Sequence, residues 1–156
     1  MRVFEQNTPV HLIEPANYGS AGIDADSVNM GLALSLAATF LFGAIVGNST
    51  LKAYSGASAG VKTTALAFKY RLSSADFKAA NADQLGAATA VASTGLSLVA
   101  ATFDHREVVV EIDADQMTDG EKWLTFEIDN VATTLNVAAL GVLAARYAGA
   151  SIPTAV

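Results

Sequence analysis

Short runs in which apolar and polar residues alternate, separated by Gly, Asn, Asp and Ser, occupy nearly all of this 156-residue chain. Successive side chains of a β-strand point to opposite faces, so this alternation is typical of strands with one buried face. Polar turns between the runs are typical of antiparallel connections. The sequence therefore predicts an all-β fold, an antiparallel β-sandwich or a jelly-roll-like barrel with at most one short helix.

Individual strands can be assigned from the first half of the chain. Glu14-Pro15 is expected to end the first of them, because proline cannot donate a ladder hydrogen bond. Residues 38–46 are either a separate strand or a continuation of the run before them, and residues 63–72 are predicted to form one strand. The predicted strands of this half cover residues 10–13, 23–30, 32–37, 38–46, 50–54 and 63–72.

The second half begins with residues 73–90, predicted to be a loop with one or two helical turns. The β-branched run 107–113 and the alternating run 123–129 are predicted to form a hairpin, with the turn signal Asp119-Gly120 in its long tip. Residues 131–147 fit an alanine-rich helix, but they also fit a strand that is covered on both faces. We favour the strand, because an antiparallel sheet offers it a partner.

The chain is expected to form one domain, since no internal repeat or low-complexity tract marks a boundary. Residues 1–9 are interpreted as an extended N-terminal arm, 10–150 as a single β domain, and 151–156 as a C-terminal tail. Val3 and Phe4 in the arm, and Ile152 and Pro153 in the tail, are candidate assembly contacts. Such apolar ends can add a strand to the open sheet edge of a neighbouring molecule.

Composition limits the classes of partner. Hydrophobic residues make up 52% of the chain and charged residues only 15%, which is apolar for a small domain. We therefore expect part of the surface to contact protein, most simply in a homo-oligomer. A formal charge of −6 and a pI near 4.7 argue against direct binding to nucleic acid. The chain has no cysteine, so disulfides, thiolate chemistry and Cys-based zinc sites are excluded.

Residues 31–46 carry no charge and raise the alternative of a membrane-associated protein. This run is shorter than the roughly 20 apolar residues that a membrane-spanning helix needs. A buried strand pair or a buried helix is the preferred interpretation. The N-terminus lacks the pattern of a secretory signal peptide, so synthesis in the cytoplasm is expected.

Two motifs suggest chemistry. Gly56-Ala57-Ser58-Ala59-Gly60 matches the G-x-S-x-G pattern of hydrolases, and His105 is the one histidine after it. A strand-like run follows instead of the helix that this motif requires, so a flexible turn is preferred over an enzyme. A small serine hydrolase using Ser58 with His105 remains the alternative from another class.

The second motif is the acidic segment Asp113–Gly120, which begins like a calcium-binding loop. Met117 occupies a ligand position and Leu124 stands where a bidentate glutamate belongs. A solvated hairpin tip is preferred, with calcium between Asp113 and Asp119 left open. No cofactor, metal site or catalytic residue is predicted.

Four segments resemble a group of small virion proteins of tailed bacteriophages, encoded near the major capsid protein. They are Val10–Ala16, Gly22–Met30, Phe68–Arg71 and Leu140–Tyr147. The resemblance implies a structural protein of the phage head, of the decoration, cement or minor capsid type, and it transfers no active site. Its implied partners are further copies of itself, as a trimer or other multimer, and the major capsid protein. A tail or head-fibre component is the alternative within the same particle.

Overall fold

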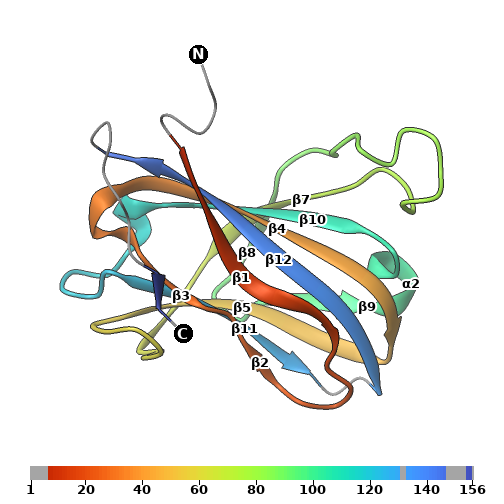
Figure 1. Cartoon of the computed structure of the whole chain (residues 1–156), viewed down its shortest axis with the longest axis horizontal. Coiled ribbons are helices and arrows are strands. Elements are labelled where there is room, and N and C mark those ends of the chain that lie inside the picture. Colours follow the sequence, from red (N-terminus) through yellow and green to blue (C-terminus); the bar gives the residue numbers. More distant parts are fainter. Residues whose placement is uncertain (1–6, 131–132, 147–153, 156) are drawn as a thin grey trace.

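Two antiparallel sheets pack against each other in the computed structural model, which describes residues 7–130, 133–146 and 154–155 (Figure 1). Sheet 1 has the strand order β1 (Asn7–Asn17), β12 (Thr134–Ala145), β4 (Ala33–Val46), β10 (Glu107–Asp113), β7 (Phe68–Leu72) and β8 (Thr89–Val91). In the described part of the chain, α2 (Ala100–Phe103) is the one α-helix. The predicted all-β sandwich with at most one short helix is confirmed.

Sheet 2 has the order β13 (Thr154–Ala155), β3 (Ser27–Asn29), β11 (Trp123–Asn130), β5 (Asn48–Gly56) and β6 (Thr64–Leu66). Two further short strands join it: β2 (Ile23–Asp24) pairs with β11, and β9 (Leu96–Val99) pairs with β5. Two 3-10 turns, η1 (Met30–Leu32) and η2 (Ala114–Gln116), follow β3 and β10. β4 and β12 are the longest strands of sheet 1 and have a partner on both sides, as do β11 and β5, the longest strands of sheet 2.

The core lies between the sheets and is filled by the inward side chains of these central strands. Phe40 and Phe42 of β4 stack with their ring centroids 6.3 Å apart. Phe126 of β11 meets Phe40 edge-on at 5.3 Å, so this aromatic pair joins the two sheets. Burying a side chain of this size contributes about 1.5–3 kcal/mol, which makes the alternation of these strands a strong determinant of the fold.

The predicted strand 63–72 is wrong in one respect, because the chain changes sheets within it. β6 pairs with β5 in sheet 2, whereas β7 pairs with β10 in sheet 1. The crossing occurs at Ala67, whose carbonyl accepts a hydrogen bond of 3.3 Å from Nε2 of Gln116. Alternation continues through the crossing, so Leu66 and Phe68 are both buried and the sequence pattern shows no break.

The predicted hairpin of residues 107–113 and 123–129 is also wrong. Both strands exist at these positions, but β10 pairs with β4 and β7, and β11 pairs with β5, β2 and β3. The segment between them is therefore a connection from one sheet to the other. Its turn at Gly120 has a φ of 80°, which fits the predicted Asp119-Gly120 turn.

Glu14-Pro15 does not end the first strand, contrary to expectation. β1 continues to Asn17 because its pairing with β12 shifts register between His11 and Ile13 and again between Ile13 and Ala16. Proline is tolerated in β1 because β1 is an edge strand of sheet 1. Residues 7–9, assigned above to the N-terminal arm, pair with β12 and so lie within the β domain.

Residues 33–46 form the single strand β4, so the predicted run 38–46 continues the run 32–37. Neither a strand pair nor a helix forms there. Among the residues that the structure describes, no helix has the length and apolarity that crossing a bilayer requires. Residues 134–145 are the strand β12, which confirms strand over helix. The segment 73–88 forms turns without a regular helix and projects away from the sandwich between β7 and β8 (Figure 1).

Candidate functional site

One outer surface of the sandwich is unusually apolar. Alternation places the buried residues of β12 toward the core and Ala138, Leu140 and Val142 on the outside of sheet 1. Leu140 and Val142 remain 51% and 38% exposed. We define the apolar face as seven uncharged side chains on the outside of three neighbouring strands, β1, β12 and β4: Pro9, Ala37, Thr39, Leu41, Ala138, Leu140 and Val142.

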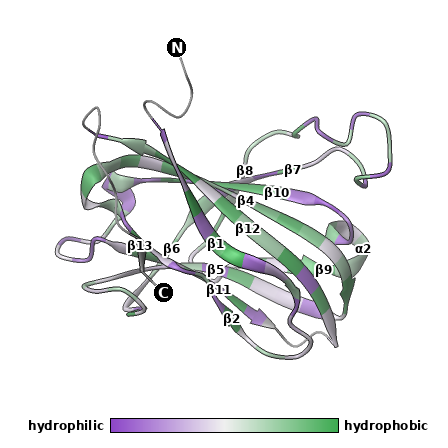
Figure 2. Cartoon of the chain, viewed as in Figure 1, coloured by the Kyte–Doolittle hydropathy of each residue, from purple (hydrophilic) through white to green (hydrophobic). Residues whose placement is uncertain are grey.

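The strand registers arrange this face in rows. Leu140 lies opposite Thr39 of β4, and Val142 lies opposite Ala37. In the next row the sizes are reversed, since Ala138 of β12 lies opposite Leu41 of β4, which is 40% exposed. Each row therefore holds one large and one small side chain. Figure 2 shows green segments along most of β4 and β12, consistent with strands that are apolar or small on both faces.

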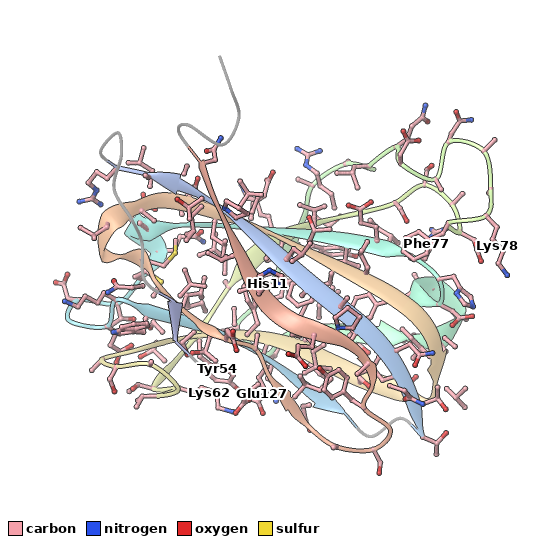
Figure 3. All side chains as sticks on the ribbon, viewed as in Figure 1. His11, Tyr54, Lys62, Phe77, Lys78 and Glu127 are labelled. Atoms are coloured by element: carbon pink, nitrogen blue, oxygen red, sulfur yellow. The ribbon has the colours of Figure 1, made fainter. Side chains whose placement is uncertain are left out.

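Charged and polar groups border the apolar face on both sides. On β10, Glu107 lies opposite Leu41 and Glu111 lies opposite Ala37, with Val109 between the two glutamates. On the other side, His11 of β1 lies opposite Leu140. Figure 3 labels His11 on β1, in the part of the sheet where β1 crosses beside β12. The face thus has an acidic border along β10, and a border along β1 that holds the His11 imidazole and, further along the strand, the exposed carboxylate of Glu14.

The outer surface of sheet 2 differs from the apolar face, because two groups of ion pairs lie on it. Nζ of Lys62 lies 2.7 Å from Oδ1 of Asp24 and 3.2 Å from Oε2 of Glu127, and 6.0 Å from the ring centroid of Tyr54. Lys62, Tyr54 and Glu127 gather on one side of the molecule in Figure 3. A further pair joins Lys52 to Asp129 at 3.4 Å. This surface is suited to water, whereas the apolar face is not.

The charges around Lys62 also change its titration. Partial burial lowers the pKa of Lys62, but the hydrogen bonds and negative charges of Asp24 and Glu127 outweigh burial and raise the pKa above its ordinary value of 10.5. Lys62 is therefore a structural cation that ties the loop after β5 to β2 and β11.

Ser58 and His105, the candidate hydrolase pair, are not brought together. Ser58 is exposed in the turn that follows the last residue of β5, Gly56. His105 lies near the other end of that strand, where its N–H donates to the carbonyl of Gly43 at 3.1 Å, close to the turn into β5. A nine-residue strand is about 30 Å long, so the two side chains lie at opposite ends of the sandwich.

The acidic segment 113–120 does not gather its carboxylates around a point. Asp113 ends β10, and its backbone N–H donates to Oε1 of Gln116 at 2.8 Å. Asp115 and Asp119 are exposed. Among the described residues, no group of three or more His, Asp or Glu side chains is arranged to hold a metal ion.

One hollow of about 350 Å³ lies between this segment and η1, lined by Met30, Lys122 and Arg146 among others. Beside it, the buried Ser55 hydroxyl donates to Oε2 of Glu121 at 2.6 Å. This polar contact links the end of β5 to the connection between the two sheets.

The candidate assembly contacts Val3, Phe4, Ile152 and Pro153 lie outside the described residues. The apolar face was not among the sequence-predicted sites. Its signal was present in the two-sided apolar pattern of residues 135–143, which indicates a strand covered on both faces. The structure of one chain covers only one of them.

No protein-family model matches the chain, and no curated protein matches it. Among solved structures, it is similar to the SPBc2 prophage-derived protein YomS, with a TM-score of 0.47 and 16% sequence identity, over 88% of this chain and 91% of that chain. A weaker similarity, with a TM-score of 0.24 and 12% identity, is to a structure of the infectious bursal disease virus Gt strain and covers 97% of this chain and 44% of that chain. Similarities at this level assign neither family nor function.

Proposed function

We propose that this protein is a structural virion protein of a tailed phage, a head decoration or cement protein that acts by binding and assembles through the apolar face. The observation that carries the proposal is the contrast between the two outer surfaces. Sheet 2 exposes ion pairs, whereas sheet 1 exposes Leu41, Leu140 and Val142. A contiguous exposed apolar surface on a small protein is typical of a protein contact.

The resemblance to phage virion proteins supports the same surface. Two of the segments that carry it, Val10–Ala16 and Leu140–Tyr147, lie in or run through the neighbouring strands β1 and β12. These strands supply Pro9, His11, Leu140 and Val142 to the apolar face and its border. Two of the four resembling segments thus contribute to the face and its border, whereas Gly22–Met30 and Phe68–Arg71 contain β2, β3 and most of β7.

Many weak contacts suffice for such a role. A decoration protein is displayed in many copies, and linking copies multiplies weak binding without any new contact to the capsid. Loss of self-assembly is therefore expected to weaken binding to the head even where the residue changed does not touch the capsid.

The test is co-sedimentation of the purified protein with heads assembled from the major capsid protein encoded near it. We expect the wild-type protein to sediment with heads, and Leu140→Glu to bind at least tenfold more weakly. The matched control is Val99→Glu, which changes a side chain of similar exposure, 41%, on β9 of sheet 2. Wild-type protein that stays in solution beside intact heads, or that binds tails alone, would contradict a head decoration role.

The N-terminal arm has a separate test. Deletion of residues 1–6 leaves all of β1 in place. If the arm adds a strand to a neighbouring copy, this deletion weakens head binding while the free energy of unfolding of the isolated subunit stays unchanged. Unchanged head binding removes the arm from the proposal.

A further inference from the structure

We infer that the apolar face is covered by a second copy of this chain, packed face to face about a two-fold axis that runs parallel to the strands between β12 and β4. The inference rests on the proposed function in taking this face as the assembly surface. It adds the identity of the occupant and the register of the contact. Three features of the face point to a second copy: its size, the order of large and small side chains, and the charges at its borders.

The outer surface around the face is large enough for a stable dimer. β1, β12, β4 and β10 are neighbours in sheet 1 and have 11, 12, 14 and 7 residues. With strands about 4.8 Å apart and about 3.3 Å per residue, these four strands present roughly 700 Å², with the apolar face at the centre. This area lies within the range of a standard protein interface, about 600–1,000 Å² on each partner.

The proposed axis places large side chains over small ones. Rotation about an axis between β12 and β4 lays β12 over the β4 strand of the second copy and keeps each residue in its own row. Leu140 then lies over Thr39 of the other molecule, and Val142 over Ala37. Leu41 lies over Ala138 in the adjacent row. Inner faces of packed sheets interdigitate in this way at about 10 Å separation.

The same rotation brings opposite borders together. β1 of one molecule lies over β10 of the other, so His11 faces the row of Val109, between Glu107 and Glu111. Each imidazole can then donate to a carboxylate, twice in the dimer by symmetry. Lys69 and Arg71 lie on β7, on the far side of β10 from β4, and are outside the contact.

The competing orientation is unfavourable. A two-fold axis perpendicular to the strands would lay β10 over β10 and β12 over β12. Glu107 and Glu111 would then face the glutamates of the second copy, and like charges in such positions repel. In the same arrangement Leu140 would lie over Leu140 of the second copy, large against large. Charge and shape therefore select the same axis.

Light scattering coupled to size-exclusion chromatography of the full chain tests the dimer. At 100 µM we expect a mass of 32 kDa, twice the 16.0 kDa of one chain. Leu140→Glu is expected to give a monomer, and Val99→Glu a dimer. A wild-type monomer at this concentration, or a trimer, would overturn the inference.

Thr39→Leu separates a contact of defined register from non-specific association of apolar surfaces. The substitution makes the face more apolar, but in the proposed register it sets a large side chain against Leu140. We expect the dimer to dissociate at least tenfold more readily. A dimer as tight as the wild type, or tighter, would show that the face associates without this row pairing. Circular dichroism and the unfolding midpoint check that each variant is folded.

The charged borders give an independent readout. His11→Glu places a carboxylate between two carboxylates and is expected to weaken the dimer at least tenfold, whereas His11→Lys preserves it. Combining His11→Glu with Glu107→Lys and Glu111→Lys is expected to restore dimerisation, an effect that a merely structural role of His11 would not produce. No restoration would overturn the β1 to β10 contact.

The outcomes also separate this inference from the proposed function. A protein that binds heads as a monomer or trimer retains the decoration role and loses the two-fold contact. A dimer that does not bind heads in the co-sedimentation experiment retains the two-fold contact and loses the decoration role.

Discussion

A Cβ atom placed on Gly56 would overlap the carbonyl oxygen of Val61, so the chain after β5 folds back directly over the end of that strand. The returning loop is also held by the N–H of Gly60, which donates to Oγ of Ser27 at 2.8 Å. Ser27 in turn shares a buried hydroxyl contact of 2.8 Å with Thr125. Close backbone contact, not flexibility, therefore explains the first glycine of the G-x-S-x-G match.

Gly56→Ala is expected to lower the free energy of unfolding by about 1–3 kcal/mol, because the backbone of Val61 must move to admit the methyl group. Gly22→Ala is the control, since its Cβ would lie 3.8 Å from the nearest atom, and we expect a change within about 0.5 kcal/mol. Urea unfolding of the two variants measures both values. Equal effects of the two substitutions would show that the loop moves away from the new methyl group at no cost in free energy.

Lys62→Gln is expected to lower the free energy of unfolding by about 1 kcal/mol at pH 7, because Asp24 and Glu127 lose their shared cation. The folded-state pKa of Lys62 is raised, so this stabilisation is fully present below the unfolded-state value of 10.5 and is lost as pH rises through the higher folded pKa. The difference between wild type and variant should thus be constant up to about pH 10 and shrink above it.

The control for this pH dependence is Lys62→Arg, whose guanidinium stays charged throughout the range. Its free energy of unfolding relative to Lys62→Gln should not decline at alkaline pH. A gap between wild type and Lys62→Gln that is as large at pH 11.5 as at pH 8 would contradict the assigned cause.

His105→Gly is expected to raise the free energy of unfolding by about 0.5–1 kcal/mol, since His105 has a φ of 53°, which costs a residue with a Cβ atom about 1 kcal/mol or more. Asn81 has a φ of 63°, but asparagine tolerates this conformation. Asn81→Gly should therefore change stability by less than His105→Gly does. Thermal unfolding compares the two, and a destabilised His105→Gly would indicate that the imidazole has a structural role.

The strands themselves could be predicted because their signal is local. Residues 107–113 form β10 with the predicted bounds, since alternation and β-branching act along one segment. The strand predicted within residues 131–147 is confirmed over 134–145, because a run that alternates on both faces pairs well between β1 and β4. Hydrophobic alternation and β-propensity are sufficient where the sequence of one segment determines its secondary structure.

Strand pairing could not be predicted in the same way. The crossing at Ala67 leaves the alternation intact, so only the partners of β6 and β7 reveal it. β10 and β11 are neighbours in sequence but prefer β4 and β5, whose inward side chains Phe40 and Ala53 complete the core. His11 lies on one border of the apolar face, and Glu107 and Glu111 lie on the other. This placement likewise depends on the order of strands in the sheet, which no single segment of the sequence determines.

Two leucines of β12 have opposite surroundings. Leu143 is fully buried, whereas Leu140 is 51% exposed on the apolar face. Leu143→Ala should lower the free energy of unfolding by about 2–5 kcal/mol at any protein concentration, because it leaves a cavity between the sheets. Leu140→Ala should cost under about 1 kcal/mol in dilute solution and more as concentration rises, because dimerisation stabilises the folded chain by mass action. Urea unfolding at 1 and 100 µM separates the two, and a concentration-independent effect of Leu140→Ala would mean that no second copy covers this face.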